Sequence, residues 1–410
     1  MLNAEIIVKV DLIQMKILYF TQLFYPAVFG GGEYIFYQWA KELIKKGHKV
    51  FVITQSIESS SPHETIDGIE IFRVGSLLHL GGTLPSGLAE NLSFLIKAFF
   101  KGLQVAKEHQ VDIIHSNTYI PVFAAQWCAT RLKIPHIATV HDVYYTSKAN
   151  FWKAWSNQAG ISKLSRILGP LIEKKIAHSS VTLFHTVSEK SKSDLQVMGA
   201  SKKIVVIPNG IDPLQYQTDT EKSKPQAIFV GRLVFYKNLD VVLEAFSKVI
   251  KKIPDARLVI VGEGPIKQSL VEKSKHLFIQ DSVTFTGNIS DQEKIRLISE
   301  SRLLLNPSLV EGFGIVLLEG FACGKPVIVS DTKPLSDLVN DSIDGFVVSP
   351  FDSEQWANRI IELLSNPDKA QEMGKIGKSK AVTNYAISKL IDSLIDLYAS
   401  VTGETKLAKE

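Results

Sequence analysis

Two glutamates, Glu311 and Glu319, lie in a glycine-rich stretch whose residue types and spacing could do chemistry. Glu311 precedes residues 314–323, whose apolar residues predict a short helix, and Glu319 falls about one and a half turns inside it. Gly324 and Pro326 end that helix. A helix start offers unpaired backbone N–H groups and the positive end of a dipole, which suit a phosphate. The alternative is that both carboxylates are solvated side chains of an ordinary strand–helix–strand unit.

Apolar runs before and after this stretch predict the strands that position it. Residues 303–305 and 327–329 are short apolar runs, which are typical of buried strands. The segment is therefore predicted to form a strand–loop–helix–strand unit. Its acidic loop opens at the carboxyl end of the first strand, and ligands bind at that edge of open parallel sheets. The pattern therefore places Glu311 at a ligand-binding edge.

A glycine triplet near the start of the chain is a second candidate. Gly31 and Gly32 follow Gly30 between a predicted strand, residues 16–21, and a predicted helix, residues 33–46. Glycine lets the backbone approach a ligand closely and leaves N–H groups free. The dinucleotide fingerprint G-x-G-x-x-G is absent. The alternative is a flexible loop.

A histidine and two cations also follow predicted strands. His141 comes directly after residues 136–140, where a polar side chain either faces a ligand or bonds to the backbone. Arg232 follows residues 227–230, and Lys237 comes five residues later. Arginine's forked donors and lysine's point charge suit a diphosphate whose charge grows as its bond breaks. Otherwise they are surface cations.

Set in EGFGIVLLEGFACGKPVIVS, Glu311 and Glu319 resemble the E-x7-E motif of the retaining nucleotide-sugar glycosyltransferases of family 4. Companion segments resemble that family too: the glycine triplet, the His-Asp pair at residue 141, the Gly-Arg-Leu at residue 231 and the Pro-Asn-Gly-Ile-Asp at residue 208. The resemblance covers nearly the whole chain after Met15. Where the family usually shows Gly-x-Pro-Glu, residues 333–337 are Lys-Pro-Leu-Ser-Asp, so a donor contact from that segment is not carried over.

The resemblance implies transfer of a sugar from a UDP- or GDP-sugar to an acceptor hydroxyl of a glycan or lipid-linked glycan, with retention at the anomeric carbon. It assigns the diphosphate to Arg232, Lys237 and the N–H groups of Gly314, Ile315 and Val316. It assigns the ribose hydroxyls to Glu319 and the sugar near its reacting carbon to Glu311 with Gly312 and Phe313. It places His141 against the sugar or the acceptor, and it places Gly31 and Gly32 facing the transferred sugar of the donor.

Strands alternate with helices in two runs, which predicts an α/β protein with two doubly wound, Rossmann-like domains facing a central cleft. The resemblance names this fold GT-B. The expected divisions are an N-terminal extension at 1–14, an acceptor-side domain at 15–207, a linker at 208–225, a nucleotide-sugar domain at 226–385 and a C-terminal helix at 386–410 that folds back toward the first domain.

The composition is that of a globular protein, with 45% apolar residues and a net charge of +4 that does not indicate nucleic acid. Cys128 and Cys323 lie far apart in apolar helical patterns, so we expect reduced thiols and a cytoplasmic protein. No apolar run is long enough to span a bilayer. Asp-x-Asp, the usual metal–diphosphate bridge of the other large glycosyltransferase fold, is absent, so we expect neither a metal nor another cofactor.

Residues 144–180 are basic and aromatic, with Glu173 as the one acid. Such a surface can lie on an anionic membrane, which would place the protein at the inner face of the cell membrane. The alternative is a loop followed by a partly buried helix, residues 161–177, in the first domain. The pattern does not decide between them.

Two other functions fit the same pattern. One is a nucleotide-sugar epimerase, or a phosphorylase of similar shape. The other is a catalytically silent protein that binds a nucleotide sugar and a partner protein. The presence of Glu311, Glu319, Arg232 and Lys237 argues against a silent protein.

Overall fold

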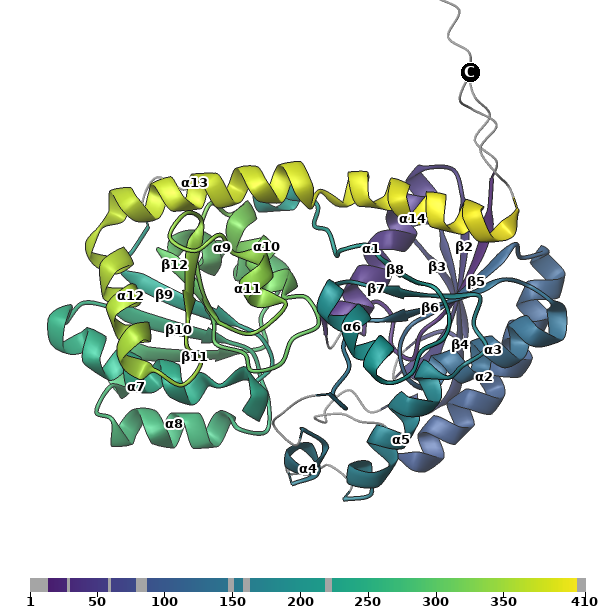
Figure 1. The fold of residues 1–410 in the computed structure, drawn as a ribbon, viewed down its shortest axis with the longest axis horizontal. Coiled ribbons are helices and arrows are strands. Elements are labelled where there is room, and N and C mark those ends of the chain that lie inside the picture. The colour runs from purple at the N-terminus through teal and green to yellow at the C-terminus, as the bar shows by residue number, and fades with distance from the viewer. Residues whose placement is uncertain are drawn as a thin grey trace, which may run out of the picture.

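The structure, a computed structural model, describes residues 14–27, 30–57, 60–78, 87–146, 151–157, 163–217 and 223–403. Two α/β domains lie side by side, each built on a mainly parallel sheet with helices packed against it (Figure 1). The expected fold, with two doubly wound Rossmann-like domains, is confirmed. Most of the expected N-terminal extension, residues 1–13, lies outside the described residues.

The sheet of the first domain has the strand order β3-β4-β2-β1-β5-β6-β7-β8. Its strands are β1 (Lys16–Phe20), β2 (Lys49–Ile57), β3 (His63–Ile66), β4 (Ile69–Leu78), β5 (Ile113–Ser116), β6 (His136–Val140), β7 (Leu183–Thr186) and β8 (Ile204–Val206). The order reverses between β1 and β5, so the loop after β1 opens at the switch point where ligands bind in such sheets.

The sheet of the second domain has the order β11-β10-β9-β12-β13-β14. Its strands are β9 (Gln226–Val230), β10 (Arg257–Val261), β11 (Val283–Gly287), β12 (Leu303–Asn306), β13 (Val327–Ser330) and β14 (Gly345–Val348). The order reverses between β9 and β12, which pair in parallel. The loops that carry Arg232 and Glu311 follow these two neighbouring strands, so the topology brings both residues to one edge.

Helices cover both sheets. In the first domain they are α1 (Gly31–Lys45), α2 (Leu88–His109), α3 (Ile120–Leu132), α4 (Phe151–Ser156), α5 (Ser165–Ala177) and α6 (Glu189–Val197). In the second they are α7 (Leu239–Lys252), α8 (Lys267–His276), α9 (Asp291–Glu300), α10 (Ile315–Ala322), α11 (Leu335–Leu338), α12 (Ser353–Ser365) and α13 (Pro367–Asn384), and α14 (Ile387–Thr402) ends the described chain. Within the described ranges, no helix has both the length and the apolarity needed to cross a membrane.

Alternation along β1 shows how one strand serves two cores. Ile17 and Tyr19 pack into the cluster that holds α1 and α14, whereas Leu18 and Phe20 pack into the cluster that holds α2 and α3. Successive side chains of a strand point to opposite faces, so a central strand buried on both sides is apolar throughout.

One strand was not expected from the sequence. β3 forms an antiparallel hairpin with β4, and the turn between them contains Asp67 and Gly68, both at positive φ. A tight two-residue turn favours Asp-Gly because both central residues take positive φ. The Asp-Gly pair is therefore the signal that would have predicted this hairpin.

The C-terminal helix returns to the first domain. α13 lies along the second domain, and α14 lies against α1 (Figure 1). Ile387, Ile391, Leu394 and Leu397 of α14 are buried in the core cluster of the first domain. The end of the chain thus ties the two domains together.

Candidate functional site

The helix α10 begins at Ile315, one residue later than the sequence predicts. Gly314 precedes it with φ +97°, a left-handed conformation that favours glycine. A Cβ added at Gly314 would lie 2.6 Å from Leu335 Cδ2, so space also requires glycine there. No side chain caps the helix start. Its first N–H groups are therefore available to an anion.

Glu311 accepts two close hydrogen bonds at one oxygen. Its Oε1 accepts from Lys237 Nζ and, at 3.0 Å, from Ser308 Oγ. Ser308 Oγ also bonds to Asn306 Oδ1 at 2.6 Å. The Glu311 and Lys237 side chains are each 15% exposed, so the pair is shielded but open to a ligand. Lys237 and Glu311 are brought together as the sequence suggests, and Ser308 is a contact that no motif indicated.

Glu319 lies deeper, with 5% of its surface exposed. Its Oε1 accepts from Lys294 Nζ at 2.9 Å and from Tyr216 Oη at 3.1 Å. Tyr216 is a buried residue of the segment expected to be a polar linker, and Lys294 lies on α9. Neither partner was predicted, because each meets Glu319 only through the folding of distant segments.

Arg232 follows β9 and faces both domains. Its Nη2 donates to Tyr236 Oη at 3.0 Å. Burial raises the pKa of Glu33 in the first turn of α1, and the Arg232 guanidinium opposes part of that rise. Burial likewise raises the pKa of Asp142, and Arg232 again acts in the opposite direction. Asp142, from the His-Asp pair noted in the sequence, therefore joins the site with Glu33, a carboxylate to which sequence reasoning assigned no role.

His141 reaches the site with one ring nitrogen unpaired. Its Nε2 is buried and has no hydrogen-bond partner among the described residues. Burial lowers the pKa of His141 to about 3, so the ring is neutral at physiological pH. A Cβ added at Gly32 would lie 3.0 Å from the Cδ2 atom of this ring. The ring therefore packs against the first turn of α1.

The two domains touch directly where the candidate residues meet; we call this region the junction. A Cβ added at Gly312 would lie 2.5 Å from the carbonyl oxygen of His141. A Cβ added at Gly31 would lie 3.4 Å from Ile315 Cγ2. Glycine at these positions thus allows the loop before α10 to contact the first domain. The junction brings together the predicted residues of both domains.

Two sequence expectations differ in detail. Gly31 and Gly32 lie in the first turn of α1 rather than in a loop before it, and Gly30 is the N-cap residue. Phe313 is a buried core residue whose ring lies 6.1 Å from that of Tyr385.

Several aromatic residues of the 144–180 segment lie at the junction, whereas Tyr145 is 52% exposed. Phe151 is buried, and its ring lies 3.9 Å from Tyr144 and 5.3 Å from Tyr236 of the second domain. Glu173 accepts from Trp152 Nε1 at 3.1 Å, and burial raises its pKa to about 7. These aromatic side chains thus help to position Tyr236, the hydrogen-bond partner of Arg232.

An exposed apolar stripe does occur nearby, next to and on α5. Leu164, Ile167 and Leu171 are 45%, 61% and 57% exposed. Basic residues of the same helix include Lys174 and Lys175 near its end. The described helix begins at Ser165 and residues 163–164 form a turn before it, while residues 161–162 of the expected helix lie outside the described residues.

Comparisons with known proteins agree with this architecture. The family model described as "Glycosyl transferases group 1" matches residues 212–380, and the model described as "Glycosyltransferase Family 4" matches residues 29–214. Alpha-monoglucosyldiacylglycerol synthase of Streptococcus pneumoniae is 27% identical over 363 residues, which cover 86% of this chain and 79% of that protein.

Solved structures share the fold over nearly the whole chain. Sucrose-phosphate synthase from Thermosynechococcus elongatus superposes with a TM-score of 0.76 at 20% identity, covering 96% of this chain and all of that one. HepE from Anabaena, solved in complex with UDP-glucose, gives 0.72 at 18% identity, covering 94% of this chain and all of that one. The two family models together span residues 29–380, and with this architecture they establish that the chain belongs to the glycosyltransferases of group 1, with the GT-B fold.

Proposed function

We propose that this glycosyltransferase transfers a sugar from a nucleotide diphosphate sugar, a UDP- or GDP-sugar, to an acceptor hydroxyl of a glycan or lipid-linked glycan. One observation carries the proposal: Arg232, the Lys237–Glu311 pair and the uncapped start of α10 converge opposite His141. HepE, which shares the fold, was solved with UDP-glucose and supports the donor class.

The leaving diphosphate gains charge as its bond to the sugar breaks, so it needs fixed positive groups. Arg232 and Lys237 supply two cations, and the N–H groups of Ile315 and Val316 supply the dipole of α10. When a donor binds, Lys237 shares its ammonium between Glu311 and the phosphate. In this proposal the chain itself carries the charge, and no metal is required.

The two glutamates take different parts of the donor. Glu319 uses Oε1 for its contacts with Lys294 and Tyr216, so Oε2 is the atom that accepts from the ribose hydroxyls. Glu311 also uses Oε1 for its contacts, and its Oε2 accepts from the sugar near the reacting carbon. His141 contacts the sugar or the acceptor through the ring edge that has no partner among the described residues. Retention is proposed from the E-x7-E resemblance.

For the acceptor, a lipid-linked glycan at the inner face of the membrane is favoured by the stripe formed by Leu164, Ile167 and Leu171. An exposed apolar stripe beside Lys174 and Lys175 suits an anionic bilayer surface. The relative from Streptococcus pneumoniae is named for a lipid product, which supports the same class. Binding to anionic vesicles should fall as the salt concentration rises, and it should be lost in the double variant that combines Ile167→Glu with Leu171→Glu. Equal binding by wild type and variant would rule out this stripe.

The proposed reaction is tested with a panel of UDP- and GDP-sugars, with and without a lipid extract. Release of nucleoside diphosphate that requires an acceptor, and a product with the donor's anomeric configuration by NMR, support it. An epimerised nucleotide sugar would indicate the epimerase alternative. Donor binding without turnover across the panel would indicate a silent protein.

A further inference from the structure

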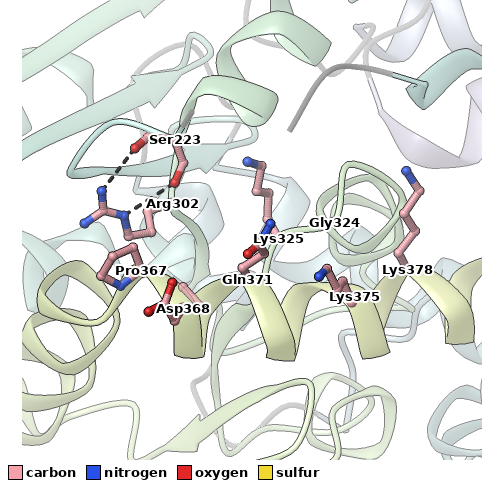
Figure 2. Close-up of a pocket in the computed structure, with 10 residues that line it drawn as sticks. Ser223, Arg302, Gly324, Lys325, Pro367, Asp368, Gln371, Lys375 and Lys378 are labelled. Carbon is pink, nitrogen blue, oxygen red and sulfur yellow. Dashed lines mark hydrogen bonds between the residues drawn. The ribbon is translucent and has the colours of Figure 1, made fainter. Parts of the chain in front are cut away.

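A cavity of about 170 Å³ lies in the second domain, and Figure 2 shows the residues that line it. Arg302 and Lys325 line it; Arg302 immediately precedes β12, and Lys325 lies two residues before β13. Glu311, by contrast, follows the carboxyl end of β12. A four-residue strand is roughly 13 Å long, so the cavity is separate from the proposed donor site.

Lys325 gives the cavity a buried cation. The residue is 3% exposed and lines the cavity, yet it forms no hydrogen bond or ion pair with any described residue through its side chain. Burial lowers the pKa of Lys325 to about 8, and the nearby charges of Arg302 and Lys378 act in the same direction. The ammonium group is not among the fully buried atoms, so it opens on the cavity, where it is shielded from most solvent and has no carboxylate partner; such a cation favours an anion.

The surrounding groups add positive charge without neutralising it. Arg302 donates from Nη2 to the carbonyl oxygen of Ser223 at 3.0 Å and from Nη1 to that of Leu364, and both acceptors are uncharged. Figure 2 shows the hydrogen bonds to Ser223, and it shows Lys375 and Lys378 on the neighbouring helix α13. Four cations therefore line this cavity among the described residues.

The start of α13 also faces the cavity. Pro367 and Asp368 open this 18-residue helix, and its N-cap residue Asn366 makes no side-chain cap. The positive end of the helix dipole favours an anion. Asp368 is the one carboxylate among the described lining residues; it is exposed and forms no ion pair with Lys325.

We propose that this cavity binds a small phosphate-bearing anion, either inorganic phosphate or the phosphate group of a small phosphomonoester, with Lys325 as its buried ligand. The volume equals that of about six water molecules at roughly 30 Å³ each, which suits a phosphate with a short carbon chain. Phosphate oxygens accept from lysine ammonium and from helix N–H groups, and a dianion meets the excess of cations.

The test is thermal unfolding of the full chain titrated with inorganic phosphate, with saturating UDP present to occupy the donor site. The wild-type midpoint should rise with phosphate and level off. In Lys325→Met the affinity should be roughly 10-fold weaker or more, because the buried charge is gone. Without phosphate this variant should be at least as stable as the wild type, since it buries no unpaired cation.

Lys369→Met is the matched control, because Lys369 lies on the same helix but pairs with Glu362 outside the cavity. It should respond to phosphate like the wild type. Glycerol 3-phosphate, with glycerol as its control, distinguishes the two sources: tighter binding than inorganic phosphate identifies a phosphomonoester, and equal binding identifies free phosphate. No response in the wild type, or equal responses in the wild type and Lys325→Met, would overturn the proposal.

Discussion

Histidines are buried both in the core of the first domain and at the junction, but their hydrogen bonds differ. In the core, His115 contacts Tyr398 Oη through Nδ1 at 2.7 Å and Thr139 Oγ1 through Nε2 at 2.6 Å. At the junction, Nε2 of His141 has no partner among the described residues. Nδ1 of the core residue His136 also lacks a partner among the described residues, so an unpaired nitrogen alone does not mark a ligand site. The nitrogen of His141 differs in its place, because it lies where the loop before α10 meets the first domain.

The core network has a single consistent direction. The carbonyl oxygen of Ile207 can only accept, so His185 donates to it from Nε2 at 3.0 Å. His185 Nδ1 then accepts from Thr139 Oγ1 at 2.8 Å, and that oxygen accepts from His115 Nε2. His115 Nδ1 accepts from Tyr398 Oη. These directions hold for neutral rings, and burial lowers the pKa of both histidines, so both imidazoles are neutral. The network also joins α14 to the sheet.

The comparison separates two uses of buried polar residues. The core network uses its hydrogen bonds among its own members, so it specifies the structure. The junction keeps the helix start at Gly314 and the ring of His141 available, and it holds Arg232 and Lys237 beside partners that a donor can share. Changes in the core should therefore alter stability, and changes at the junction should alter turnover.

The largest expected effect is acid destabilisation of the core. Burial lowers the pKa of His136 to about 3 and that of His185 to about 4, from an unfolded value near 6.5. Above pH 6.5 these histidines are neutral in both states, and their full contribution to the free energy of unfolding is present. That contribution is lost as the pH falls toward 4, because protonation favours the unfolded chain. At pH 5.5 these two residues alone lower the free energy of unfolding by about 3 kcal/mol.

His115 and His141 act in the same direction. Burial raises the pKa of Glu173 to about 7 and also raises that of Glu33 and Asp142, so these three carboxyls offset part of the effect, because acid stabilises their buried forms. Urea unfolding followed between pH 7 and pH 5.5 measures the effect. A midpoint that does not fall over this range would show that the buried histidines are not held neutral.

At the junction, Glu311→Gln should lower turnover by about 100-fold or more, a loss of roughly 3 kcal/mol of transition-state stabilisation. The variant replaces the carboxylate at the proposed reacting centre by a neutral amide of similar shape. The thermal midpoint should not change. Glu354→Gln is the control, because it breaks a surface pair with Lys248 in the same domain and should keep full turnover. Near-normal turnover in Glu311→Gln would contradict the assignment.

Arg232→Ala should lower turnover by an amount equivalent to about 2–4 kcal/mol, because it removes charged hydrogen bonds from the leaving diphosphate. Wild-type activity should survive excess chelator. Arg296→Ala, which removes a surface arginine paired with Glu293, serves as the control and should be active. If chelator abolishes wild-type activity and magnesium restores it, a metal supplies the charge and the proposed role of Arg232 is wrong.

The sequence predicts the parts of this molecule that depend on local pattern. The strands around Glu311 and the helix that carries Glu319 follow from apolar runs and from Gly324. Topology then explains why Arg232 and Glu311 meet, since their loops follow adjacent strands at the switch point.

Contacts between distant segments could not be predicted in the same way. Tyr216 and Lys294 bond to Glu319 from segments with no motif of their own. The aromatic residues after position 144 match a membrane surface as well as an interior, because composition does not say what they pack against. Phe151 contacts Tyr236 only once the domains are assembled.

The smallest effect we expect is that of Tyr398→Phe, which tests whether the core network holds the returning helix. The hydroxyl of Tyr398 lies between Tyr19 Oη, at 3.1 Å, and His115 Nδ1. Its removal leaves a buried acceptor on His115 without a donor, which costs about 1–3 kcal/mol. Tyr385→Phe is the control, because its hydroxyl makes no hydrogen bond to a described residue and lies outside this network.

Urea unfolding should show a lower midpoint for Tyr398→Phe than for Tyr385→Phe, while turnover per folded molecule stays at the wild-type value in Tyr398→Phe. A loss of turnover at full stability would mean that α14 affects the junction directly, and the separation between the two regions would fail. An unchanged midpoint would instead mean that water replaces the hydroxyl and that apolar packing of Ile391 and Leu394 suffices to hold α14.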